Sequence, residues 1–373
     1  EPIKKDNIKE ILACGSNMKN TFCIAKENFI FLSQHNGNLE NVETIEHYKN
    51  NIEHFKNIFN FTPKYIACDM HPNYISSEYA YRSSLPRIEV QHHHAHIVSC
   101  LAENNVDRKV IGIAYDGTGY GVDGRIWGGE FLLCDNKEFT RLGHLNYVKM
   151  PGGEMAVKEP WRMAVSYIYN LFKSAKYNEY STNKQLKEIL IKLYGNKAMN
   201  IIAMIEADIN CPETSSMGRF FDAAASLIGL RDSVTYEGQA SIELEAVASQ
   251  ESLDFYDYDV VQENGYIVKT EKIIMGIIRD KLLDEQDNVI SDKFHNTIIK
   301  FSKDICKLIR KDTGINEVAL SGGVFQNSYL LKNLSNELKN EEFLVYTNKL
   351  IPANDGGIAL GQIVIANEVL SDK

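Results

Sequence analysis

Apolar residues in the first quarter of the chain occur either in short runs or at helical spacing. This pattern predicts an alternation of strands and helices. Short apolar runs predict strands at residues 11–14, 21–25, 29–32, 65–68 and 88–90. Apolar residues at helical spacing predict a helix over 45–59, between the third and fourth of these strands. A His-rich segment of helical character follows the last strand. The unit predicted to repeat is three strands, a helix, a strand and a further helix, and in this first copy the additional strand at 88–90 precedes the His-rich segment.

A similar order returns later in the chain. Apolar runs predict strands at residues 110–115, 127–133, 139–145, 318–320 and 343–346, and helical spacing predicts helices over 294–308, 329–338 and 359–369. A mostly helical insertion, at about 155–285, separates the two parts of this second copy. We therefore expect a duplicated α/β fold with a first lobe at 1–105 and a second lobe at 106–373. Such sheets bind ligands at the carboxyl ends of their strands, so the two lobes should face a central cleft.

Composition and charge narrow the classes of protein and partner. Of the 373 residues, 44% are apolar and 24% are charged, which is typical of a folded globular chain. The net charge of −10 disfavours nucleic acid or an anionic membrane as the main partner. No apolar run approaches the roughly 20 residues of a membrane span. Seven scattered cysteines without a Cys-x-x-Cys pair speak against a cysteine zinc site and fit a reducing cytoplasm. The start at Glu1, without Met, suggests a fragment of a longer protein.

The densest candidate chemistry is a cluster of four histidines within residues 92–96. On a helix, His92 and His96 share one face with roughly 5–6 Å between their Cβ atoms, so both imidazoles could reach one metal ion. The alternative is a half-buried polar helix start. Asp116 and Asp355 are candidate carboxylate ligands, with a turn-forming Asp and a helix N-cap as their respective alternatives. Two histidines with carboxylates suit Fe(II), Zn(II) or Mn(II).

Glycine-bearing segments indicate phosphate contact. Gly117-Thr118-Gly119 follows a predicted strand, and Gly322-Gly323 lies between a predicted strand and a helix. Glycine lets backbone N–H groups approach an anion closely, and a helix N-terminus adds positive potential. Neither segment matches a P-loop, and a purely conformational role is an equal alternative.

Seven motifs that run in order along nearly the whole chain resemble the C-terminal part of the HypF family, the carbamoyltransferases of nickel–iron hydrogenase maturation. They are Cys14-Gly15-Ser16-Asn17-Met18-Lys19-Asn20-Thr21-Phe22, Leu32-Ser33-Gln34-His35, His92-His93-His94-Ala95-His96, Asp116-Gly117-Thr118-Gly119, Trp127-Gly128-Gly129-Glu130, Lys158-Glu159-Pro160-Trp161-Arg162 and Ser321-Gly322-Gly323-Val324-Phe325-Gln326-Asn327. The chain is also similar to threonylcarbamoyl-transferases of the TsaD type and to antibiotic O-carbamoyltransferases. All of these resemble the actin/hexokinase/Hsp70 (ASKHA) fold, which agrees with the duplication.

The resemblance implies roles for individual residues. It implies that His92, His96 and Asp355, joined in HypF-like members by Asp116, bind a metal. The implied contacts to a nucleotide or carbamoyl-adenylate are Asp116, Gly117, Thr118, Gly119, Asp222, Gly238, Gly322, Gly323 and Asn327. Lys158 and Arg162 are candidate catalytic residues, with surface charge as their alternative, and helix capping is the alternative for the segment at Gly238.

The resemblance also implies a cytoplasmic enzyme. It would transfer the carbamoyl group of carbamoyl-adenylate, made from ATP and carbamoyl phosphate, to the C-terminal cysteine of HypE for synthesis of the hydrogenase cyanide ligand. The implied cofactors are a divalent transition metal (Fe or Zn) and ATP or AMP, with Mg²⁺ as a further candidate. The implied partners are the HypE tail and the acylphosphatase, zinc-finger and YrdC-like domains of full-length HypF, none of which fits in this chain. Two alternatives are a carbamoyl- or threonylcarbamoyl-transferase acting on a small molecule or tRNA, and a non-catalytic nucleotide-binding module.

Overall fold

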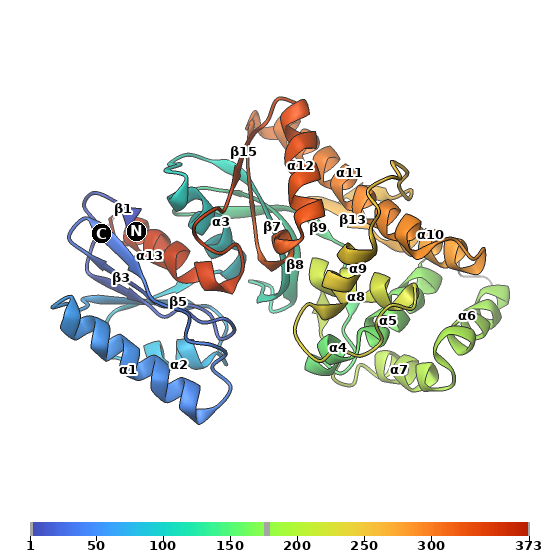
Figure 1. The fold of residues 1–373 in the computed structure, drawn as a ribbon, viewed down its shortest axis with the longest axis horizontal. Helices are drawn as coiled ribbons and strands as arrows, with labels where there is room; N and C mark the ends of the chain where they lie inside the picture. Colours follow the sequence, from blue (N-terminus) through green and yellow to red (C-terminus); the bar gives the residue numbers. More distant parts are fainter. Residues whose placement is uncertain (1–2, 175–179, 372–373) are drawn as a thin grey trace.

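The first lobe is built on a six-stranded sheet in the computed structural model, which describes residues 3–174 and 180–371 (Figure 1). Its elements are β1 (Ile3–Lys4), β2 (Ile11–Ala13), β3 (Cys23–Lys26), β4 (Phe29–Leu32), α1 (Val42–Ile58), β5 (Tyr65–Asp69), α2 (Ile75–Tyr81) and β6 (Arg87–Val90). The sheet order is β1-β4-β3-β2-β5-β6. The strands β4, β3 and β2 are antiparallel neighbours, whereas β5 and β6 run parallel to β2.

The second lobe repeats this plan in a larger sheet. Its elements in that sheet are β7 (Val110–Tyr120), β8 (Ile126–Cys134), β9 (Phe139–Leu145), β14 (Glu317–Ser321) and β15 (Leu344–Thr347), ordered β9-β8-β7-β14-β15. Again three antiparallel strands are followed by two parallel ones. The duplicated α/β architecture expected from the sequence is therefore confirmed.

The insertion in the second lobe is mainly helical. It contains α4 (Glu154–Lys158), α5 (Pro160–Lys173), α6 (Tyr180–Tyr194), α7 (Lys197–Glu206), α8 (Met217–Leu227), α9 (Gln239–Val247) and α10 (Glu271–Leu282), which lie to the right in Figure 1. The hairpin β12 (Asp259–Gln262) and β13 (Tyr266–Lys269), which the sequence analysis does not anticipate, extends the second sheet beyond β9. The short strands β10 (Val148–Lys149) and β11 (Glu213–Thr214) pair with one another beside β8.

Two helices pack between the sheets and connect the lobes. They are α3 (His92–Glu103) and α13 (Ile358–Ser371), while α11 (Asp287–Thr313) and α12 (Ser328–Asn340) cover the second sheet from the other side. Apolar side chains of α13 join the core of the first sheet, and those of α3 divide between that core (Ala95, Val98) and the core of the second sheet (Ile97, Cys100, Leu101). A Cβ at Gly361 would lie 2.0 Å from the carbonyl oxygen of Ala95, so α13 can approach α3 this closely only with glycine there.

The structure corrects one element boundary that bears on the site. The segment 116–119, expected as a loop after a strand, lies inside β7. The pairing of β7 with β8 shifts register between Tyr115 and Gly119 and then resumes at Trp127. This bulge re-aims the side chain of Asp116 without ending the strand.

None of the described helices has both the length and the apolar character that spanning a bilayer requires. All seven cysteines are buried and unpaired.

Candidate metal centre

The His-rich segment forms the first turns of α3. Gln91 caps the helix, because its side chain accepts a hydrogen bond of 2.8 Å from the backbone N–H of His94. The imidazoles of His92 and His96 lie on one face, with ring centroids 5.0 Å apart. His94 points elsewhere, and its Nε2 lies 2.8 Å from the carbonyl oxygen of Asp135. The i, i+4 spacing therefore brings two imidazoles together in a buried position.

Two carboxylates from distant parts of the chain meet these imidazoles. Asp116 Oδ2 lies 3.3 Å from Nε2 of His92 and 3.7 Å from Nε2 of His96. Asp355 Oδ1, in the short 3₁₀ helix η3 (Asp355–Gly357), lies 3.7 and 3.6 Å from the same two nitrogens. One ligand atom from each of the four residues falls within 4.8 Å of all the others. The structure thus assembles the four predicted metal ligands.

The chemistry of this group fits a divalent transition metal. Nε2 of His92 and Nε2 of His96 are buried and have no hydrogen-bond partner in the described part of the chain, a costly state unless another group satisfies them. Ligands bound at about 2.0–2.2 Å around a tetrahedral ion lie about 3.3–3.6 Å apart, close to the nitrogen–oxygen separations seen here. Imidazole and carboxylate donors suit Zn(II) and Fe(II).

Asp69 orients the first histidine, and the sequence analysis does not identify it. Nδ1 of His92 donates to Asp69 Oδ2 at 2.7 Å, and Asp69 is fully buried at the end of β5. The other carboxylate oxygen accepts from the backbone N–H of His71 at 2.8 Å. A carboxylate in this position fixes the tautomer that leaves Nε2 free to bind a metal. Its only sequence signal is an Asp directly after a short apolar run.

The charges of the site perturb its pKa values strongly. Burial alone would lower the pKa of His92, but the surrounding carboxylates, first that of Asp69, raise it well above the usual range. Burial would raise the pKa of Asp116, whereas the imidazoles of His92 and His96 beside its carboxylate hold that pKa well below its usual range. A carboxylate whose pKa is lowered in this way favours positive charge beside it, which suits a divalent cation.

Each carboxylate ligand is held by a neighbour. Asp116 Oδ1 accepts from the backbone N–H of Gly323 at 3.0 Å, and Ser16 Oγ donates to Asp355 Oδ2 at 2.5 Å. The N-cap of η3 is Asn354, so the capping alternative for Asp355 does not hold. Ser16 was not anticipated as a site residue.

The residues predicted to contact nucleotide fall in several places. Gly117, Thr118 and Gly119 continue β7 beside Asp116, whereas Gly322, with a φ of 109°, precedes the 3₁₀ helix η2 (Gly323–Gln326). Asp222 accepts from Arg219 Nε at 2.7 Å, and Arg219 Nη1 donates to the carbonyl of Gly117 at 3.3 Å. Arg219, which the sequence analysis does not name, thereby links Asp222 to β7.

Two further predicted nucleotide contacts occupy helix starts. Gly238, with a φ of 78°, is the N-cap of α9. Asn327 is the N-cap of α12, where its side chain accepts from the N–H of Leu330 and its Nδ2 lies 2.9 Å from Nε2 of His295. Both have structural roles, and nucleotide contact by either remains a prediction.

The two candidate catalytic cations form ion pairs within their own segment. Lys158 Nζ lies 2.9 Å from Glu154 Oε1, and Arg162 pairs with Glu159. The side chain of Lys158 is 61% exposed, as expected for the surface-charge alternative. Their catalytic role remains a prediction.

Comparison with known proteins identifies the family. Residues 6–103 match the family described as the HypF Kae1-like domain, and residues 112–362 match the one described as the carbamoyltransferase, Kae1-like domain, second subdomain. The chain belongs to the HypF family. The carbamoyltransferase HypF of Synechocystis sp. is 36% identical over 97% of this chain, which spans 48% of that relative. A HypF homolog of Cupriavidus necator is 30% identical over 95% of this chain, which spans 91% of it.

A solved HypF structure has the same fold. The crystal structure of full-length HypF in the phosphate- and nucleotide-bound form superposes with a TM-score of 0.92 and 45% identity. The match covers 99% of this chain and 57% of that protein. The chain therefore spans about half the length of these full-length HypF relatives.

Proposed function

We propose that this chain transfers the carbamoyl group of carbamoyl-adenylate to the C-terminal cysteine of HypE. The observation that carries the proposal is the group of the buried His92, His96 and Asp116 with the half-buried Asp355, in a chain of the HypF family. A divalent metal held by these residues would supply Lewis-acid chemistry toward a carbonyl or phosphoryl oxygen. We further propose that the YrdC-like, zinc-finger and acylphosphatase domains of full-length HypF supply the earlier steps, in which ATP and carbamoyl phosphate give the adenylate.

The proposed reaction exchanges one bond at the carbamoyl carbon. The HypE thiolate sulfur forms a bond to that carbon, and the bond from the carbon to the phosphate oxygen breaks. The electron pair leaves with AMP, and the product is a thiocarbamate on HypE. Backbone N–H groups of the Gly117–Gly119 segment are the proposed donors to the phosphate, with Arg219 close by as a counter-charge.

The state of the chain's own cysteines supports a nucleophile from outside. Burial raises the pKa of all seven thiols, and that of Cys14 reaches about 12. A thiol becomes a nucleophile only as its thiolate, so none of these groups is activated. The seven unpaired cysteines of this chain also favour a reducing compartment, and we propose the cytoplasm.

The test supplies carbamoyl-adenylate and HypE to the purified chain after loading with Fe(II) or Zn(II). We expect the C-terminal cysteine of HypE to gain the mass of one carbamoyl group, and His92→Ala with His96→Ala to abolish both metal binding and transfer. A matched control is His47→Ala with His54→Ala, because these two histidines are exposed on α1. Transfer to tRNA or a small molecule in place of HypE, or full transfer by the variant lacking His92 and His96, would contradict the proposal.

A further inference from the structure

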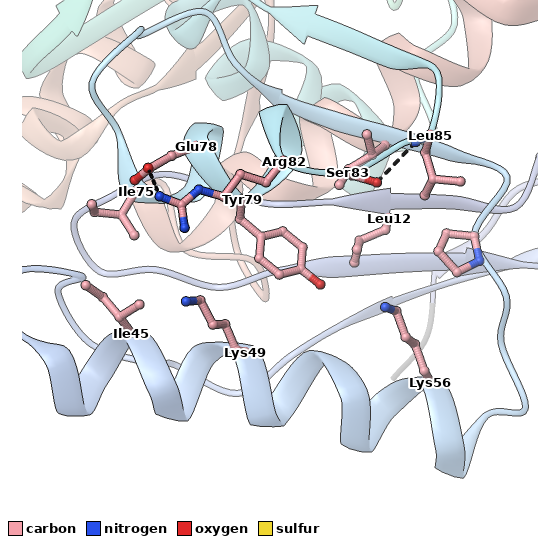
Figure 2. A pocket seen from close by; sticks show the side chains of 12 residues that line it. Leu12, Ile45, Lys49, Lys56, Ile75, Glu78, Tyr79, Arg82, Ser83 and Leu85 are labelled. Carbon is pink, nitrogen blue, oxygen red and sulfur yellow. Dashed lines mark hydrogen bonds and ion pairs between the residues drawn. The ribbon is translucent and has the colours of Figure 1, made fainter.

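A cavity of about 510 Å³ lies between α1, α2 and the face of the first sheet that α1 covers (Figure 2). Its floor includes Leu12 of β2 and Ile66 of β5, which are paired across the sheet and each 1% exposed. None of its lining residues belongs to the metal centre. The cavity is therefore separate from the site of the proposed transfer.

The wall formed by α1 has an unusual pattern. Ile45, Lys49, Ile52 and Lys56 recur at helical spacing along one face of α1, and Ile52 is fully buried. A helix face that only packs on a sheet is apolar throughout, so two lysines in this stripe need an explanation. Figure 2 shows both lysine side chains extending from α1 toward the sheet, with the ring of Tyr79 projecting into the same space from α2.

The lining of the cavity carries excess positive charge. Arg82 at its rim is paired with Glu78, and Lys56 Nζ lies 2.7 Å from Glu53 Oε1, which is outside the lining. Within residues 3–174 and 180–371, the ammonium group of Lys49 has no carboxylate partner. Three cations and one carboxylate therefore line the cavity, in a chain whose net charge is −10.

We propose that this cavity binds a small amphipathic anion, with one acid head group on an apolar body. The apolar body would lie against the half-buried side chains of Ile45, Ile75 and Leu85, and the head group would lie beside Lys49 and Lys56. An inorganic anion would leave the half-buried apolar side chains of Ile45, Ile75 and Leu85 uncovered, and an uncharged apolar molecule would leave the ammonium group of Lys49 without an anionic partner. The volume falls in the range of about 300–1,000 Å³ that is typical of small-molecule sites.

The test uses the purified chain and anilinonaphthalene sulfonate, an apolar fluorophore with one anionic group. We expect saturable binding at a single site, competition by decanoate, and no competition by decanol or acetate. Lys49→Met with Lys56→Met keeps the apolar stems and removes both charges, so affinity should fall about tenfold. Near-ultraviolet circular dichroism checks that this variant remains folded.

Lys300→Met with Lys307→Met is the matched control. These lysines are also seven residues apart on one helix, α11, one half-buried and one exposed as in the Lys49 and Lys56 pair, and the change removes the same charge away from the cavity. Affinity should not change in this variant. Binding at several sites, no binding, equal competition by decanol, or unchanged affinity in the Lys49 and Lys56 variant would each overturn the proposal.

Discussion

Asp69 offers a direct test of the metal centre, because it touches a ligand without being one. Its carboxylate accepts the Nδ1–H of His92 at 2.7 Å and the backbone N–H of His71 at 2.8 Å. Asp69→Asn preserves the size of the side chain and replaces one acceptor oxygen by an NH₂ donor. If the remaining oxygen stays with the N–H of His71, the new NH₂ group faces Nδ1 of His92. The proton of the imidazole is then favoured on Nε2, which is the nitrogen that must bind the metal.

The expected magnitude follows from this tautomer change. The loss of a carboxylate that orients a metal-binding histidine lowers metal affinity by about 10–100-fold, or about 1.4–2.7 kcal/mol. The whole effect should fall on metal affinity, since the other three ligands keep their partners. The change should therefore be smaller than for removal of His92 itself, which deletes a ligand.

The assay is competition for Zn(II) between the protein and a chromophoric chelator. Glu89→Gln is the control, because Glu89 is exposed on β6, the strand next to β5, and the change removes the same charge. We expect the dissociation constant of this control to match that of the unaltered chain. If Asp69→Asn also bound Zn(II) within twofold of the unaltered chain, the argument from the tautomer would be refuted.

Two further predictions concern packing and charge near the centre. A Cβ at Gly119 would lie 2.7 Å from Cδ2 of His92, so Gly119→Ala should reduce metal affinity and destabilise the fold by about 1–3 kcal/mol. Gly117→Ala, by contrast, should be tolerated. Thermal unfolding and metal titration measure the two effects, and equal behaviour of the two variants would contradict the prediction. Burial alone would raise the pKa of the fully buried Glu130, but the ion pair with Arg141 lowers this pKa below 4.5. The charge of Glu130 therefore stabilises the fold at neutral pH, and this contribution is lost as the pH falls through the folded-state pKa. Glu130→Gln should lower the free energy of unfolding, measured in urea at neutral pH, by about 3 kcal/mol. The difference from the unaltered chain should shrink below pH 4.5, and a difference that stays constant with pH would contradict the reasoning.

The sequence predicts those parts of the fold and the site that depend on short-range pattern. Alternation and helical spacing identify the strands and helices of both copies, and the i, i+4 pair of His92 and His96 follows from helix geometry alone. The assignment of Asp116 and Asp355 depends on resemblance to the family, because nothing local to either residue links it to the histidines.

Contacts between distant segments explain what the sequence analysis missed. Asp69 is 23 residues from His92, and only the pairing of β5 with β6 brings the two together. The segment 116–119 has the composition of a turn, yet the pairing of Tyr115 and Gly119 with β8 on either side of the bulge keeps it within β7. The hairpin β12–β13 depends on an edge strand more than 100 residues earlier in the sequence, β9. In each case tertiary pairing overrides local propensity.

The position of α13 has a consequence for how the protein is made. Its Gln362 accepts from the backbone N–H of Gly15 at 2.8 Å, across 347 residues of sequence, and its apolar side chains cover one face of the first sheet. A ribosome synthesises α13 after every strand of both sheets, so that face of the first sheet stays uncovered while the second lobe is translated. The earliest-synthesised lobe is therefore among the last parts to be completed, and during that interval its exposed strands are a target for chaperones.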